Sequence, residues 1–339
     1  SQHIGDLATA ECFGFYEKTF HHFLSLLEVT PQVIVRDLHP DYSSTLFAKQ
    51  LSERSHIPLI ALQHHVAHIC AVLAEHAIAH KVIGIALDGT GYGGDGTLWG
   101  GELLLVGPCR WQRVGRFSPI LLPGGEAAIR SPWRIAEALC TQHGIPGHGP
   151  WHDGRERARS ALPEMITHGI NCPETSSCGR LFDAVSALGG LCFDITYEGQ
   201  AAIRLEQAQD FNENGHYDMP IAEKSTLLEA DVHVLFREAA EDRDRPGIMA
   251  RRFHRGLAKG LAKWACKASE KYHADDIVLA GGVFNNRTLL AETLHELSML
   301  GLNPVVPSAF PFGDGAISLG QAYWGDLMLC SGKCAGDIP

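Results

Sequence analysis

Residues 82–97 read VIGIALDGTGYGGDGT, and they indicate the architecture of the chain. The apolar run at residues 82–87 is typical of a strand buried inside an α/β protein. Asp88 follows the run, and five glycines occupy the next eight residues. A carboxylate and exposed backbone N–H groups at a strand end suit a phosphate and its metal. Residues 88–97 therefore predict phosphate binding, with a glycine hairpin turn that binds nothing as the alternative.

Strands and helices alternate on both sides of this stretch. Apolar runs predict strands at residues 32–36, 57–63, 82–87, 98–106 and 111–117. Helical patterns occupy residues 7–27, 42–54 and 64–79. Since the last two strands form an antiparallel hairpin, the prediction is an α/β fold with a mixed sheet.

The second half of the chain is mainly helical. Helices are predicted at residues 127–142, 179–191, 198–210, 227–241, 248–272 and from about 316 to 329, and irregular structure at residues 144–153. A strand, a glycine pair and a helix follow one another at residues 276–297. Because this repeats the turn at Asp88, two related lobes around one cleft are predicted. The first covers residues 1–118 and is completed by the closing helix at residues 311–330, and the second covers residues 119–310.

Composition excludes several classes of protein. Apolar residues make up 45% of the 339 residues and charged residues 20%, which excludes a disordered chain. No apolar run is long enough to span a membrane, and a net charge of −11 argues against binding nucleic acid or an anionic membrane. The ten cysteines form no C-x-x-C pair, so we expect reduced thiols in a cytoplasmic protein without a signal peptide. The first residue, Ser1, suggests a trimmed longer polypeptide.

A metal site is predicted at residues 63–68, QHHVAH. If His64 opens a helix, His64 and His68 lie one turn apart on one face and can hold one ion. The alternative is a helix start that is rich in histidine. Asp314, in the segment PFGDG before the closing helix, is either a further ligand or only a helix cap. Other histidines and cysteines are expected to be surface groups without a ligand: His143, His148, His152, Cys330 and Cys334.

Two further segments suit a nucleotide. Gly281 and Gly282 let the backbone approach a ligand closely, and the helix that follows favours an anion at its first turn. An ordinary turn with an asparagine cap explains the same residues. Asp183 and Glu198 can accept hydrogen bonds from ribose hydroxyls, or they are capping and surface acids.

Taken together, eleven phrases resemble the C-terminal carbamoyltransferase module of the hydrogenase-maturation family HypF. In chain order they are SQHIGDL (1–7), DLHPDY (37–42), QHHVAH (63–68), ALDGTGYGGDGTLWGGE (86–102), LPGG (122–125), PWR (132–134), GRLFD (179–183), YEGQA (197–201), RFH (252–254), GGVFNNR (281–287) and GDG (313–315). The resemblance implies the actin/Hsp70/sugar-kinase fold, with two RNase H-like lobes around a nucleotide. It also implies that the first strands of the N-terminal lobe are missing.

The resemblance implies a metal and a nucleotide at named residues. One divalent metal, zinc, iron or magnesium, is held by His64, His68 and Asp314, with Asp88 near it or on it; these four are the implied catalytic residues. The nucleotide is the ATP or AMP moiety of carbamoyladenylate. Its implied contacts are Asp88, Gly89, Thr90, Gly91, Gly124, Gly125, Asp183, Glu198, Gly199, Gly281, Gly282 and Asn286.

The resemblance also implies a reaction and its partners. The module moves a carbamoyl group from carbamoyladenylate to the C-terminal cysteine of HypE, and the product becomes the cyanide ligand of [NiFe]-hydrogenase. A YrdC-type domain, in cis or in trans, makes the adenylate. One alternative is carbamoyl or threonylcarbamoyl transfer to a small hydroxyl compound or tRNA, which the acidic charge disfavours for tRNA. Another is an ATP-binding regulatory scaffold, which has no need of a two-histidine metal site.

Overall fold

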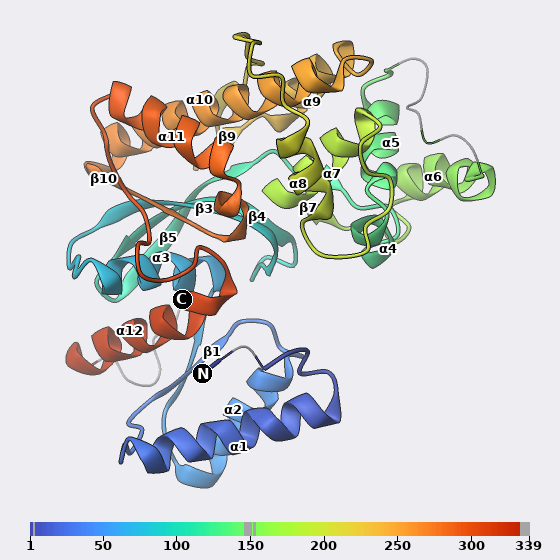
Figure 1. The fold of residues 1–339 in the computed structure, drawn as a ribbon. Helices are drawn as coiled ribbons and strands as arrows, with labels where there is room; N and C mark the ends of the chain where they lie inside the picture. Colours follow the sequence, from blue (N-terminus) through green and yellow to red (C-terminus); the bar gives the residue numbers. More distant parts are fainter. Residues whose placement is uncertain (3, 146–150, 152–153, 333–339) are drawn as a thin grey trace.

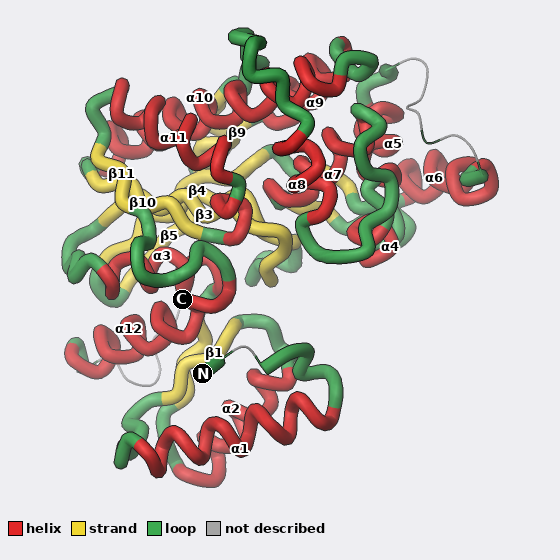
Figure 2. Tube along the Cα trace, in the orientation of Figure 1, coloured by secondary structure: helices red, strands yellow, loops and turns green. Residues whose placement is uncertain are grey.

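A mixed β-sheet with helices on both faces makes up most of this computed structural model (Figures 1 and 2). The structure describes residues 1–332 apart from residue 3, residues 146–150 and residues 152–153. The main strands lie in the order β11-β10-β3-β4-β5-β9-β8, and β7 joins β6 to β4. Their bounds are β3 Val82–Tyr92, β4 Leu98–Gly107, β5 Arg110–Phe117, β6 Ile120–Leu121, β7 Glu174–Thr175, β8 Ile221–Lys224, β9 Leu227–Ala230, β10 Asp276–Ala280 and β11 Asn303–Val305.

Strand β3 is buried on both faces, which explains its continuous apolar run. Ile83, Ile85 and Leu87 belong to the core on the side of helices α7 (Cys178–Leu188), α10 (Pro246–Tyr272) and α11 (Arg287–Met299). Val82 and Ala86 point to the other side and join a second core with α3 (His64–Glu75) and α12 (Ile317–Cys330). The predicted mixed α/β sheet is therefore confirmed.

A smaller unit at the N-terminal end lies beyond α12 (Figure 1). It consists of α1 (Ala10–Leu26), β1 (Ile34–Asp37), α2 (Ser43–Ser55) and β2 (Leu59–Leu62), and its two strands pair in parallel. Helix α12 contacts both β1 and α3, so this helix lies between the smaller unit and the main sheet. The approach of α12 to α3 is very close, since a Cβ atom on Gly320 would lie 1.8 Å from the carbonyl oxygen of Ala67.

The remaining helices gather beside α7, away from the edge formed by β11 (Figure 2). Their bounds are α4 Glu126–Arg130, α5 Trp133–Gln142, α6 Glu156–His168, α8 Gln200–Gln207 and α9 Val232–Glu241. Helix α6 was not predicted. Among the described helices, none combines the length and the apolar composition that a membrane crossing requires.

The helix predicted at residues 227–241 is wrong over its first four residues. Leu227–Ala230 is strand β9, which pairs in parallel with β5 and antiparallel with β8, a strand that was not predicted. Asp231 then caps α9 by accepting a hydrogen bond from the N–H group of His233. Since a helix begins after its cap, the helix cannot extend back over β9.

Some predictions concern residues that the structure describes only in part. Most of the irregular segment predicted at residues 144–153 lies outside the described residues, as do His148, His152 and Cys334. His143 is half-buried, and its Nε2 atom lies 2.9 Å from Nδ1 of His233. The prediction that it is a free surface group is therefore wrong. Cys330 is an exposed free thiol. The lobe boundaries at residues 118 and 311 stay a prediction.

Candidate metal and nucleotide site

His64 and His68 lie on the first turns of α3, as the sequence predicted. Gln63 caps this helix, because its side-chain oxygen accepts hydrogen bonds from the backbone N–H groups of His65 and Val66. The rings of His64 and His68 lie on one face with their centroids 4.8 Å apart, and both side chains are buried. The cap at Gln63 therefore fixes where the helix begins and which face carries the histidine pair.

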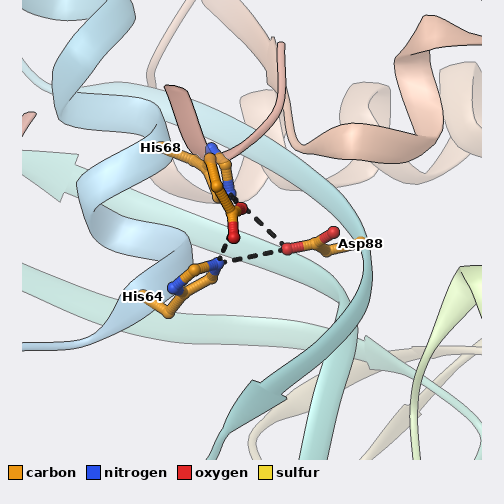
Figure 3. Close-up of side chains that lie close together, drawn as sticks. His64, His68 and Asp88 are labelled. Atoms are coloured by element: carbon orange, nitrogen blue, oxygen red, sulfur yellow. Dashed lines mark hydrogen bonds and ion pairs between the residues drawn. The ribbon is translucent and has the colours of Figure 1, made fainter. Parts of the chain in front are cut away.

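Two aspartates from distant parts of the chain meet this histidine pair. Asp88 Oδ2 lies 3.2 Å from Nε2 of His64 and 3.5 Å from Nε2 of His68 (Figure 3). Asp314 Oδ1 lies 3.5 Å from the same two nitrogen atoms. One ligand atom from each of these four residues lies within 4.8 Å of all the others. The carboxylate of Asp314 is the exposed member, so the site opens to solvent on its side.

Asp314 is carried to this position by the loop before α12. The N–H group of Gly281, at the end of β10, donates a hydrogen bond to the carbonyl oxygen of Phe312. This bond ties the loop to the part of the sheet where Asp88 lies in β3, because β3 and β10 are parallel neighbours. Asp314 opens a short 3-10 helix, and its side chain faces the histidine pair.

The four residues fit a divalent metal. Nε2 of His68 is buried and forms no hydrogen bond with any residue that the structure describes, although two carboxylate oxygens face it. Two ligands at zinc distances of about 2.0–2.1 Å in a tetrahedral site lie roughly 3.4 Å apart, close to the 3.2–3.5 Å separations found here. Mixed imidazole and carboxylate ligands suit zinc or iron and are compatible with magnesium.

The site is strongly polarised. Burial opposes ionisation of Asp88, but the imidazoles of His64 and His68 hold its pKa well below its ordinary range. Burial likewise opposes protonation of His64, yet hydrogen bonds to Asp314, Asp37 and Asp88 raise its pKa well above the ordinary value. Ionised carboxylates thus converge where a cation can replace the imidazole proton.

Asp37 belongs to this site, although it was not predicted from the sequence to be a site residue. Its Oδ2 atom lies 2.9 Å from Nδ1 of His64, and its Oδ1 atom accepts a hydrogen bond from the backbone N–H group of His39. A proton on Nδ1 of His64 leaves Nε2 free to bind a metal. The signal for Asp37 in the sequence was its carboxylate at the end of β1. Strand β1 pairs in parallel with β2, and β2 leads directly into His64.

The glycine-rich stretch continues strand β3 instead of forming a separate loop. It pairs with β4 as far as Tyr92, with a bulge between Leu87 and Gly91. Gly91 is required by packing, because a Cβ atom there would lie 2.4 Å from Cε1 of the buried His65. The exposed hydroxyl of Thr90 donates to the carbonyl oxygen of Gly89.

The second glycine pair also lies next to Asp88. Gly281 has a φ of 99°, and a Cβ atom on it would lie 2.3 Å from the carbonyl oxygen of Leu87, so only glycine is accommodated there. A Cβ atom on Gly282 would lie 3.3 Å from Oδ1 of Asp88. The glycine-rich part of β3 and the glycine pair after β10 therefore meet beside Asp88, although the first is a strand and not the predicted turn.

Asp183 lies on α7, and Glu198 lies in the turn before α8. Asp183 is buried and pairs with Arg180, whose Nη1 atom lies 3.0 Å from Oδ2 of Asp183. Burial raises the pKa of Asp183 to about 6. Glu198 is exposed, and its carboxylate lies near Gly89.

The other predicted nucleotide contacts are placed differently. The side-chain oxygen of Asn286 caps α11, and its amide group lies 2.8 Å from Nε2 of the buried His254, so both of its polar groups are already occupied. Gly124 and Gly125 form the turn between β6 and α4, with positive φ angles. Gly199 caps α8 in the left-handed conformation. The roles of these residues in nucleotide binding stay predictions.

The fold and the site define a class of α/β protein in which a mixed sheet carries a histidine–aspartate cluster that can hold a metal ion, next to two glycine-rich segments. Residues 84–321 match the family model for the second subdomain of the Kae1-like carbamoyltransferase domain, and residues 1–75 match the HypF Kae1-like domain. The chain therefore belongs to the HypF family of Kae1-like carbamoyltransferase domains.

Individual relatives agree with this assignment. The chain is 37% identical to carbamoyltransferase HypF of Synechocystis sp. over 95% of its length, but it spans only 43% of that protein. It is 36% identical to a carbamoyltransferase HypF homolog of Cupriavidus necator, over 94% of this chain and 84% of that one. A crystal structure of full-length HypF in a phosphate- and nucleotide-bound form superposes with a TM-score of 0.89 at 34% identity, covering 97% of this chain and 52% of that one. The predicted actin/Hsp70/sugar-kinase type of fold is confirmed.

Proposed function

We propose that this chain transfers a carbamoyl group from carbamoyladenylate to the C-terminal cysteine of a HypE-type partner. The thiocarbamate product is the precursor of the cyanide ligand of [NiFe]-hydrogenase. The observation that supports this best is the convergence of two histidines and two aspartates beside the glycine turns, in a chain of the HypF family. Formation of carbamoyladenylate from carbamoyl phosphate and ATP is assigned to a YrdC-type domain, in cis or in trans.

The transfer joins the cysteine sulfur to the carbamoyl carbon and breaks the bond from that carbon to the phosphate oxygen. AMP leaves with the electron pair of that bond, and the thiol proton passes to solvent. Because carbamoyladenylate is a mixed anhydride, its carbonyl group is already activated. The protein must therefore bind AMP as a leaving group and admit a thiolate, but it need not supply a nucleophile of its own.

The residues of this chain have separate parts in such a reaction. His64, His68, Asp88 and Asp314 hold the divalent metal, which when bound supplies Lewis-acid polarisation and neutralises phosphate charge. The glycine turn after β10 leaves the space beside Asp88 free of side chains, which suits a nucleotide. The open side at Asp314 admits the acceptor tail.

The cysteines of the chain agree with an external thiol acceptor. Burial raises the pKa of the Cys70 and Cys178 thiols well above the ordinary value, so neither supplies a thiolate near neutral pH. The nine cysteines that the structure describes are free, which supports the reducing cytoplasm as the compartment.

Mass spectrometry of the acceptor tests the proposal. The chain is incubated with preformed carbamoyladenylate and a HypE-type partner, and the C-terminal peptide of the partner is analysed. One carbamoyl group is expected on the cysteine, and none on a partner whose terminal cysteine is replaced by alanine. Asp314→Ala should abolish transfer, while Asp326→Ala, an exposed aspartate on α12, should not.

The activation step provides a second arm of the same experiment. With carbamoyl phosphate and ATP alone, the chain should be inactive until a YrdC-type domain is added in trans. Formation of carbamoyladenylate by the purified chain would contradict the proposed division of labour. Carbamoylation of tRNA or of a small hydroxyl compound, with none on the cysteine, would favour the alternative transferase.

A further inference from the structure

Arg180 is a buried cation that has N–H donors without a hydrogen-bond partner in the described part of the chain. It lies in the first turn of α7 and is 6% exposed. Its Nη1 atom approaches Asp183 at 3.0 Å, but without the geometry of a hydrogen bond. Within the described part of the chain, neither Nε nor Nη1 of Arg180 has a hydrogen-bond partner. A buried guanidinium is costly unless its donors are satisfied, so this arginine is suited to an acceptor that the protein itself does not provide.

The other edge of the guanidinium faces the glycine-rich strand. A Cβ atom on Gly89 would lie 3.4 Å from Nη2 of Arg180, whereas Glu198 is the next nearest side chain at 4.0 Å. The start of α7 packs directly on this strand, since a Cβ atom on Gly179 would lie 2.9 Å from Cα of Gly89. The hydroxyl of Ser177, the cap of α7, donates to the carbonyl oxygens of Asp88 and Gly89.

An anionic ligand beside Gly89 needs Arg180, because the other charged side chains around it are negative. Asp88, Asp314 and Glu198 surround the glycine turns with carboxylates, which repel a phosphate group. The planar fork of an arginine side chain matches phosphate oxygens, and here it lies beside its counter-ion Asp183. A role as counter-ion to Asp183 alone would not explain why Nη2 points to Gly89, which has no side chain to occupy that position.

We infer that Arg180 binds the phosphate of the nucleotide, with Asp183 as its buried counter-ion. This inference rests on the proposed function, because it assigns a residue to the AMP moiety of the proposed substrate. It distinguishes phosphate recognition, at Arg180 and Gly89, from recognition of the nucleoside.

Calorimetric titration of the chain with AMP and with adenosine tests the inference. The main variant is the double substitution Arg180→Gln/Asp183→Asn, which removes both buried charges together and so leaves neither unpaired. Its affinity for AMP should fall roughly 10- to 100-fold, as expected for the loss of one or two charge-assisted hydrogen bonds. Its affinity for adenosine should equal that of the matched control, Asp183→Asn alone.

The ratio of the AMP affinity to the adenosine affinity decides the outcome. The inference is overturned if this ratio is the same in the double variant and in Asp183→Asn. If the double variant does not fold, Asp183→Asn alone tests the inference. This substitution leaves Arg180 without its buried counter-ion, so the ratio of the AMP affinity to the adenosine affinity must stay at or above that of the unmodified chain. An unmodified chain that binds AMP no better than adenosine contradicts the inference alone. One that binds neither compound contradicts the proposed function as well.

Discussion

Replacing Asp37 by asparagine should weaken metal binding, although Asp37 does not touch the metal position. Oδ1 of Asp37 accepts the N–H group of His39, and Oδ2 lies 2.9 Å from Nδ1 of His64. In Asp37→Asn the amide oxygen can keep the bond to His39, and the NH₂ group then faces Nδ1. Two donors cannot pair, so the ring of His64 moves its proton to Nε2, the atom that must bind the metal.

The expected loss is about 10- to 100-fold in metal affinity, the range found when an outer carboxylate of a metal-bound histidine is removed. Such a loss equals roughly 1.4–2.7 kcal/mol, which agrees with the 1.5–3 kcal/mol of a hydrogen bond to a charged group. The dissociation constant for zinc is measured by competition with a chelator. Asp41→Asn, the same change at an exposed position four residues further along the chain, is the control. A zinc affinity of Asp37→Asn within twofold of the unmodified chain, or an equal loss in Asp41→Asn, refutes this reasoning.

Three further predictions concern packing, pH and metal removal. Gly320→Ala places a Cβ atom 1.8 Å from the carbonyl oxygen of Ala67, so the free energy of unfolding in urea should fall by about 1–3 kcal/mol or more. Gly14→Ala, with open space around it in α1, should raise this free energy by up to about 1 kcal/mol. Burial raises the pKa of Asp183 from 3.8 to about 6, so the folded chain holds a proton that the unfolded chain lacks between these values. The free energy of unfolding, relative to Asp183→Asn, should therefore fall by up to roughly 3 kcal/mol as the pH rises through that window, and a constant difference would count against the buried carboxyl. Zinc at 100 times its dissociation constant should stabilise the unmodified chain by about 2.7 kcal/mol, and a chelator or Asp314→Ala should abolish this gain in a thermal melt.

The features that could be predicted from sequence depend on residues that lie close together along the chain. The apolar run of β3 and the spacing of His64 and His68 each lie within one element, and period and spacing alone identify them. The signal for β3 and for the histidine pair is local, and the fold preserves it. The two glycine segments were expected to meet around one ligand, but it is the parallel pairing of β3 with β10 that brings them together, and no local pattern predicts that pairing.

The features that were missed depend on contacts across the fold. Asp37 is 27 residues from His64, and only the parallel pairing of β1 with β2 brings the two side chains together. Strand β9 has a composition that a helix tolerates equally well, and its pairing with β5 decided its structure. The side chain of Asn286, predicted to contact the nucleotide, is occupied by a helix cap and by His254, which no spacing rule reveals.

The central claim is that His64, His68, Asp88 and Asp314 form one metal site, and metal analysis of the purified chain tests it most directly. Zinc- or iron-loaded protein, dialysed and measured by atomic emission, should contain one ion per chain. His64→Ala/His68→Ala should contain none, while His143→Ala/His233→Ala, which removes the other histidine pair of the described chain, should keep the ion. Undiminished metal content in His64→Ala/His68→Ala would contradict the account.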